Sequence, residues 1–176
     1  MTENDKYLLR DLAKRYLDIC NTQEQQERRK LWRAHNSFKG DRPLIYVRAV
    51  AWHEMPQSVC QCEDPFARTY ENFFRYHLFW DTLKDDSIFE PWVTVNAVYK
   101  SAGWGVGSKV ISPGVAGGAC KFDYPIKELD DIKKLIFPKH EIDEEKTSIN
   151  VQRLYDAIGD IITINVDRGP AYRMWS

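Results

Sequence analysis

The run WVTVNAV, residues 92–98, decides the fold that this sequence predicts. It is dominated by apolar and β-branched residues, as expected of a buried strand. Two similar runs, LIYV at 44–47 and IITINV at 161–166, lie on either side of it in the chain. Helical patterns separate the three runs, and strands that alternate with helices are typical of a parallel sheet. The fold class predicted from the sequence is therefore α/β.

Two helical patterns precede the run at 92–98. Residues 5–35 are predicted to be helical, with apolar side chains at three-to-four spacing up to Cys20, a break expected at 21–22, and an almost wholly polar, solvated helix after it. Asp64 and Pro65 suit the N-cap and the first position of a further helix, which extends to about Leu83. That helix is rich in aromatic residues, and we interpret it as core or interface rather than as a cofactor site.

A glycine-rich loop and two more helices are predicted between 103 and 159. Glycines cluster at 103–118, with a short strand expected at 109–111. Residues 126–137 show the spacing of a short amphipathic helix. Asp143 is placed to cap the last helix, and Gly159 is placed to end it.

The composition argues against several classes of protein. The 176 residues include 25 Lys+Arg and 26 Asp+Glu, and this near balance argues against a nucleic-acid partner. Arg48 interrupts the best candidate for a membrane span. The polar start has no signal-peptide core, and four cysteines are too few for a disulfide scaffold at this length. We therefore expect a cytoplasmic protein that does not contact a membrane.

The predicted sheet is incomplete within this chain. A buried parallel strand needs helices on both faces or closure into a barrel, and a closed (β/α)₈ barrel needs about 250 residues. The last apolar run ends only about ten residues before Ser176. We therefore expect the N-terminal part of a larger (β/α)₈ TIM barrel, or else a domain that another chain completes.

Three motifs resemble those of the uroporphyrinogen decarboxylase superfamily. GDRP at 40–43, directly before the run at 44–47, resembles the turn G-x-x-x-D-R-x-P before the first strand of that family. Residues 126–138 resemble its I-x-x-L-x-D-L-x-x-L…P stretch, and residues 160–170 resemble its strand that ends in Gly-Pro. The resemblance covers residues 32–176.

This resemblance implies a (β/α)₈ barrel and a division of the chain. Residues 1–39 would form an N-terminal helical extension, and residues 40–176 would form the first, incomplete half of the barrel. The family's decarboxylases carry two arginines in an R-Q-A-G-R-Y motif, of which Arg48 matches the first while Trp52 replaces the second. They also need an aspartate near the end of the next strand, where this chain has Asn96.

The departures at Trp52 and Asn96 favour the methyltransferase branch of the superfamily. By resemblance, the full-length protein would move a methyl group between a methylated or methoxylated small molecule and a corrinoid protein. The corrinoid would be carried by that partner, and zinc would be held only by the C-terminal half of the barrel. The alternatives are a uroporphyrinogen decarboxylase of tetrapyrrole biosynthesis, and a non-catalytic half-barrel fragment or interaction module. We expect the 176-residue chain alone to be inactive.

The candidate site follows from the rule that barrel enzymes place their chemistry at the carboxyl ends of the strands. His53 or Glu54 is the candidate general acid or base, because demethylation leaves an alkoxide or phenoxide that needs a proton. The alternative is that both lie in a surface loop. The predicted substrate-binding residues are Arg48, Trp52, Asn96, Tyr99, Trp104, Asn165, Asp167, Arg168 and Tyr172.

Two patterns that suggest other ligands are incomplete. Cys60 and Cys62 have only His53 nearby, whereas zinc needs three or four ligands, so we predict two loop thiols and no metal. The glycines from 103 to 107 do not complete a phosphate-binding motif, because Ser108 stands where the motif needs another residue. We expect a flexible loop there, with Trp104 as a lid residue.

Overall fold

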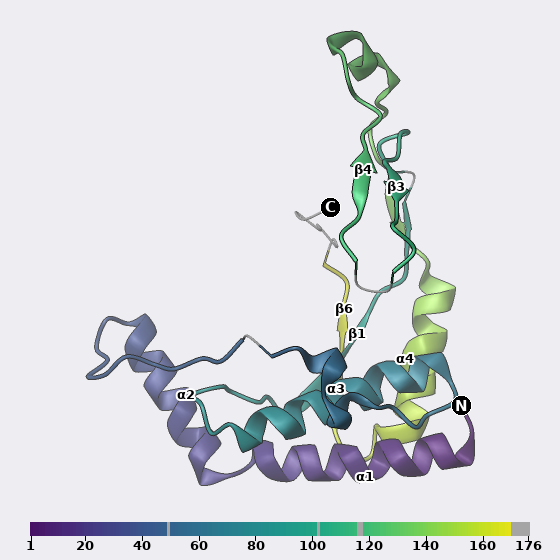
Figure 1. The fold of residues 1–176 in the computed structure, drawn as a ribbon. Helices are drawn as coiled ribbons and strands as arrows, with labels where there is room; N and C mark the ends of the chain where they lie inside the picture. Colours follow the sequence, from purple (N-terminus) through teal and green to yellow (C-terminus); the bar gives the residue numbers. More distant parts are fainter. Residues whose placement is uncertain (49, 102, 116–117, 170–176) are drawn as a thin grey trace. The chain divides into compact units, whose positions relative to one another are not determined.

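The computed structural model describes residues 1–48, 50–101, 103–115 and 118–169 (Figure 1). The chain divides into two compact units. The first unit comprises residues 1–96 and 148–167, and the second comprises residues 97–147 and 168–176. The fold is α/β, as the sequence predicts. The division at residue 39 that the resemblance implies stays a prediction.

The helices of the first unit begin and end close to their predicted positions. α1 (Glu3–Cys20) and α2 (Gln23–Asn36) are separated by the expected break. α3 (Pro65–Thr82) begins with Asp64 as its N-cap, whose side chain accepts a hydrogen bond from the Phe66 N–H at 2.9 Å. Proline at the first helical position loses no hydrogen bond, which is why this pair starts the helix so clearly.

α4 (Glu144–Ile158) begins in the second unit and continues in the first. Asp143 Oδ1 accepts a hydrogen bond from the Lys146 N–H at 3.1 Å, which confirms the predicted cap. At Gly159, a Cβ atom would lie 2.6 Å from the ring of Tyr155. The chain therefore needs glycine where this helix ends.

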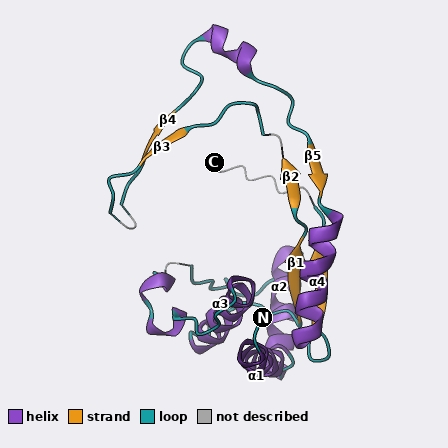
Figure 2. Ribbon diagram, turned by 90° about the vertical axis from the view of Figure 1, so that its right-hand side faces the viewer, coloured by secondary structure: helices purple, strands orange, loops and turns teal. Residues whose placement is uncertain are grey.

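A two-stranded parallel sheet lies in the core of the first unit. β1 (Trp92–Asn96) pairs with β6 (Thr163–Asp167), and α4 belongs to the connection between them (Figure 2). Val93 and Val95 are buried in one cluster with Leu154 of α4. Parallel neighbours need such a long crossover, so the pair has the connectivity of a β/α fold.

The predicted strand at 44–47 is absent, and this prediction was wrong. The Ile45 N–H donates to Asp86 Oδ2 at 2.8 Å, and the Val47 N–H donates to Asp85 Oδ2 at 2.9 Å. The Trp80 indole donates to the Val47 carbonyl at 3.2 Å. Side chains thus take the backbone groups that a neighbouring strand would use.

The second unit contains two short antiparallel pairs. β2 (Tyr99–Ser101) pairs with β5 (His140–Ile142), and β3 (Lys109–Ile111) pairs with β4 (Lys121–Asp123). β3 confirms the strand predicted inside the glycine-rich region. The helix predicted at 126–137 is only a 3₁₀ helix, η3 (Leu129–Lys134), because none of its residues is buried and its apolar side has no core to pack against.

The described residues hold three two-stranded sheets, and none of these closes into a barrel. Within the same residues, no helix combines the length and the apolar character needed to cross a bilayer.

Candidate functional site

The carboxyl ends of β1 and β6 place three predicted site residues together. Asn96 ends β1 opposite Asp167 of β6, and Thr94 lies opposite Asn165. Because the strands are parallel, their carboxyl ends lie at the same end of the sheet. Ligands of α/β proteins bind at this end, so it is the first candidate for a functional site.

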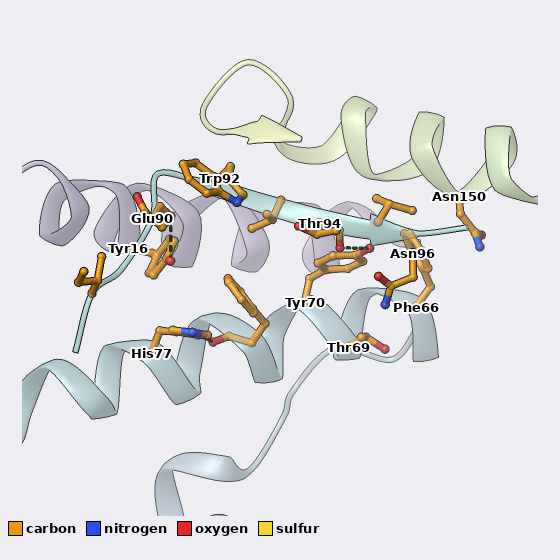
Figure 3. A pocket seen from close by; sticks show the side chains of 14 residues that line it. Tyr16, Phe66, Thr69, Tyr70, His77, Glu90, Trp92, Thr94, Asn96 and Asn150 are labelled. Carbon is orange, nitrogen blue, oxygen red and sulfur yellow. Dashed lines mark hydrogen bonds between the residues drawn. The ribbon is translucent and has the colours of Figure 1, made fainter. Parts of the chain in front are cut away.

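A cavity of about 560 Å³ extends along β1 (Figure 3). All five residues of β1 line it. Successive side chains of a strand point to opposite faces of its sheet. A cavity that all five residues line therefore runs along the side of β1 and is not confined to one face. We call this cavity the β1 groove. Its lining residues are Tyr16, Phe66, Thr69, Tyr70, Phe73, His77, Ile88, Glu90, Trp92, Val93, Thr94, Val95, Asn96 and Asn150.

Aromatic side chains of α3 and α1 form one wall of the β1 groove. Five residues of α3 at helical spacing, from Phe66 to His77, line the groove, and all but Thr69 carry an aromatic ring. The Tyr70 hydroxyl donates to the Thr94 carbonyl at 3.5 Å, and the Tyr16 hydroxyl donates to the Glu90 carbonyl at 2.9 Å. Burial raises the pKa of Tyr70 to about 12, so this hydroxyl remains a donor at neutral pH.

His77 adds a neutral acceptor to this wall. Its Nδ1 lies 2.7 Å from the Phe73 carbonyl, which only accepts hydrogen bonds, so Nδ1 carries the proton and Nε2 is left as an acceptor. The ring centres of Tyr16 and Phe89 lie 5.5 and 5.7 Å from the centre of the imidazole ring. Burial lowers the pKa of His77, which keeps the ring uncharged at neutral pH.

The end of the β1 groove next to the strand terminus is polar but uncharged. Asn96, Thr69 and Asn150 of α4 lie at this end (Figure 3). The one charged residue among the lining residues, Glu90, is paired with Arg29 at 3.4 Å. An aromatic cavity with a few uncharged polar groups suits a neutral, partly apolar ligand or chain segment.

The structure does not bring the predicted catalytic pair to the end of β1. His53 and Glu54 lie in η1 (Trp52–Glu54), their side chains are 83% and 72% exposed, and His53 Nε2 is 3.5 Å from Glu54 Oε1. The Trp52 indole donates to Asn72 Oδ1 at 2.8 Å, and its ring packs on Tyr76. Trp52 therefore contacts α3 from its middle, at Asn72, into its C-terminal half, at Tyr76 and Phe79.

The residues of α3 next to Asn96 belong to its N-terminal half (Figure 3). Along the helix axis Tyr76 lies about 10 Å beyond Thr69, whereas Asn72 lies only about 5 Å beyond it. Neither His53 nor Glu54 lines the β1 groove. Arg48 does not line the β1 groove either: it is exposed, and its guanidinium lies 4.9 Å from the ring centre of Tyr46.

Three other predicted site residues, Tyr99, Trp104 and Arg168, belong to the second unit. Tyr99 donates to the Gly169 carbonyl, and Arg168 pairs with Glu144, Nη1 to Oε2 at 3.0 Å. Trp104 is 57% exposed and lines a separate apolar cavity of about 650 Å³. Tyr172 lies outside the described residues.

The described residues do not fit a zinc site. They contain no group of three or more His, Cys, Asp or Glu side chains that could hold a metal ion. The Cys62 side chain is buried, and burial raises the pKa of its thiol well above the ordinary value. The zinc that the resemblance implies therefore has no ligand set in this part of the chain.

Tyr16, Thr69 and Asn150 were missed by the sequence analysis. They come from α1, α3 and α4, and line one cavity only because these helices pack around β1. The spacing of the aromatic residues of α3 was visible in the sequence, but it is equally typical of a core helix.

Comparisons of the chain with protein-family models, curated proteins and solved structures found no match. Any functional conclusion therefore depends on the chemistry of the residues themselves.

Proposed function

We propose that this chain is the N-terminal part of a (β/α)₈ barrel methyltransferase of the uroporphyrinogen decarboxylase-like superfamily. The full-length protein would move a methyl group between a methylated or methoxylated small molecule and a corrinoid protein. The motifs at 40–43, 126–138 and 160–170 support this proposal, as does the helix-containing connection between parallel strands β1 and β6.

The observation that carries the choice of reaction is Asn96 at the carboxyl end of β1. Decarboxylation of a porphyrinogen needs a carboxylate to stabilise a cationic pyrrole, and an amide has no charge for that role. Methyl transfer needs no such carboxylate. Asp167 supplies a carboxylate opposite Asn96, on the neighbouring strand, so the decarboxylase is the alternative that an assay has to separate.

The proposed reaction breaks the bond between the methyl carbon and an oxygen of the donor. The electron pair of that bond stays on the oxygen, which takes up a proton, and the methyl group passes to the reduced corrinoid of the partner protein. Asn96 is suited to donate its amide N–H to this oxygen as negative charge develops. His53 or Glu54 is the proposed proton donor. Both would have to be brought to the strand end by a part of the protein outside the first unit.

The test uses the protein as its native source makes it, with the intact mass measured first. The protein is mixed with reduced cobalamin and, separately, with methoxyphenol or methanol. We expect methylcobalamin and the demethylated donor in equal amounts, and no turnover by the 176-residue chain alone. Turnover of uroporphyrinogen without methyl transfer would instead establish the decarboxylase.

A variant sharpens this assay. Asn96→Ala in the full-length protein should lower kcat by about 10²-fold, as loss of one donor to a developing oxyanion does elsewhere. Thr163→Ala, an exposed position at the opposite end of the sheet, is the control and should leave kcat within about threefold of wild type. An unchanged rate for Asn96→Ala would remove Asn96 from the proposal.

A further inference from the structure

We propose that a cavity between α1 and α3 is a binding site for a small organic carboxylate that has an apolar body. The cavity has a volume of about 290 Å³, at the lower end of the range for small-molecule sites. It lies in the first unit, and none of the described residues that line it belongs to β1 or β6. We call it the α1–α3 cavity. A strand added beside β1 would therefore not fill it.

The helical repeat places an arginine next to apolar side chains on both helices. On α1, Arg15 follows Leu12 by three residues. On α3, Leu78 and Phe79 follow Arg75 by three and four residues. Residues at these spacings lie on one face of a helix. Leu12 is buried in the core cluster, and Leu78 and Phe79 pack against the same cluster. All five residues line the α1–α3 cavity, so guanidinium groups and apolar surface occur together there.

Arg75 is held in place and still has donors to offer. Its Nε donates to Glu71 Oε1 at 2.7 Å, and the Glu71 side chain is buried. The same carboxylate accepts hydrogen bonds from the N–H groups of Gln61 and Cys62. Within the described residues, neither terminal nitrogen of Arg75 donates a hydrogen bond. A guanidinium fixed in this way loses little conformational freedom when its remaining N–H groups bind a carboxylate.

Arg15 and Gln57 supply further N–H donors. Arg15 Nη1 lies 3.6 Å from Asp11 Oδ2, which is too long for a hydrogen bond, and 60% of the Arg15 side chain is exposed. Gln57 belongs to η2 (Pro56–Ser58) and also lines the cavity. Its side-chain amide has no hydrogen-bond partner among the described residues. Because an ionised carboxylate only accepts hydrogen bonds, it matches this set of donors.

The lining residues select both parts of the ligand. Among the described residues that line the cavity, only Arg15 and Arg75 are charged, which favours an anionic group. A carboxylate pairs with a guanidinium through two parallel hydrogen bonds. The apolar side chains of Leu12, Leu78 and Phe79 would bury an aliphatic or aromatic body, whereas a bare inorganic anion would leave them in contact with water. The cavity is separate from the carboxyl end of β1, so a negative methyl-transfer assay would not count against this site.

The probe is benzoate, titrated into the full protein at low salt. Binding is measured by calorimetry, and the amide groups are followed by NMR. We expect saturation below about 10 mM, with the largest shifts at Arg15, Gln57 and Arg75. Benzamide has the same ring without the charge, and acetate has the charge without the ring. Each should bind at least about tenfold more weakly than benzoate. Absence of saturation, or equal affinity for benzoate and either of the other two compounds, would overturn the proposal.

Two variants of α1 test the role of Arg15. Arg15→Gln should weaken benzoate binding at least about fivefold. Asp11→Asn removes the carboxylate that competes for Arg15, and should tighten binding about two- to fivefold. All positions changed are exposed, so the chain should fold. The matched control is Lys14→Gln, which removes the same charge from a neighbouring residue that does not line the cavity, and should leave the affinity within about twofold. Equal weakening by Arg15→Gln and Lys14→Gln would mean that net charge alone attracts benzoate, and would overturn the proposal.

Discussion

Residues 44–47 and 92–96 are both short, apolar and rich in strand-forming residues, yet only the second pairs as a strand. Val93 and Val95 alternate with exposed residues and are buried between the helices, and the strand has β6 beside it. Ile45 and Tyr46 are 64% and 50% exposed, and the segment at 44–47 has no strand neighbour among the described residues. Strand propensity therefore shows that a segment can adopt the extended conformation, but whether it forms a strand depends on whether another strand is available to pair with it.

The segment at 44–47 is held by carboxylates. Asp86 accepts the Ile45 N–H and binds both terminal nitrogens of Arg42 at 2.6 and 2.8 Å. Its own N–H donates to the Ile45 carbonyl at 2.9 Å. Arg42 belongs to the GDRP motif that carries the family resemblance, so in this structure the motif has a visible anchoring role, separate from any role in chemistry.

Removal of the Asp86 carboxylate should have the largest effect on stability. Asp86→Ala deletes the acceptor for Arg42 and for the Ile45 N–H, at a carboxylate that is only 12% exposed. We expect a loss of about 2–3 kcal/mol in the free energy of unfolding, as for hydrogen bonds to charged groups. Limited proteolysis should cut faster within 41–48. Unchanged cleavage there would show that the apolar contacts of the segment suffice to hold it.

Truncation of one apolar side chain in each of the two runs, at 92–96 and at 44–47, should change the free energy of unfolding by different amounts. The larger of the two changes should still be smaller than that of Asp86→Ala. Val95→Ala removes two carbons from a fully buried position and should cost about 2 kcal/mol, measured by urea unfolding. Ile45→Ala removes more carbon atoms from an exposed position and should change the free energy by less than about 0.5 kcal/mol. Equal costs at the two positions would contradict the burial of β1.

Acid should release the segment at 44–47 while β1 stays paired. The hydrogen bond from Arg42 is the main cause that lowers the pKa of Asp86, to about 2, below its ordinary value near 4. A lowered pKa means that the contribution of this carboxylate to stability is complete above about pH 4 and is lost as the pH falls toward 2. Amide exchange at Ile45 should therefore accelerate over this range before exchange at Val93 does. Asp86→Asn should remove the pH dependence.

The sequence predicted those parts of the fold that local chemistry decides. Asp64 and Pro65 mark the start of α3, the break at 21–22 separates α1 from α2, and a run of apolar and β-branched residues marks β1. The absence of the strand at 44–47 was not predictable, because it depends on carboxylates about 40 residues away along the chain. Local patterns contain no information about which distant side chains take a segment's backbone donors.

The candidate site was predictable only where it coincides with the ends of strands. Asn96, Asn165 and Asp167 were identified because parallel strands bring their carboxyl ends together. The wall of the β1 groove was not identified, since Tyr16 and Asn150 belong to helices whose packing the sequence does not specify residue by residue. His53 and Glu54 were chosen because they follow the run at 44–47. Since that run does not form a strand, there is no longer a reason to expect them at the carboxyl end of the sheet.

The smallest effect concerns the loop that holds the segment at 44–47. Ser87 follows Asp86, and its buried hydroxyl has no hydrogen-bond partner among the described residues. The N–H and carbonyl of Ser87 are satisfied separately, by Asp85 and by Gln25 and Arg28. Ser87→Ala removes a hydroxyl that is desolvated without compensation, so we expect stability to be unchanged or raised by up to about 1 kcal/mol in urea unfolding. A loss of stability would mean that the hydroxyl is bonded in solution, and that the loop anchors the segment through Ser87 as well as through its two carboxylates.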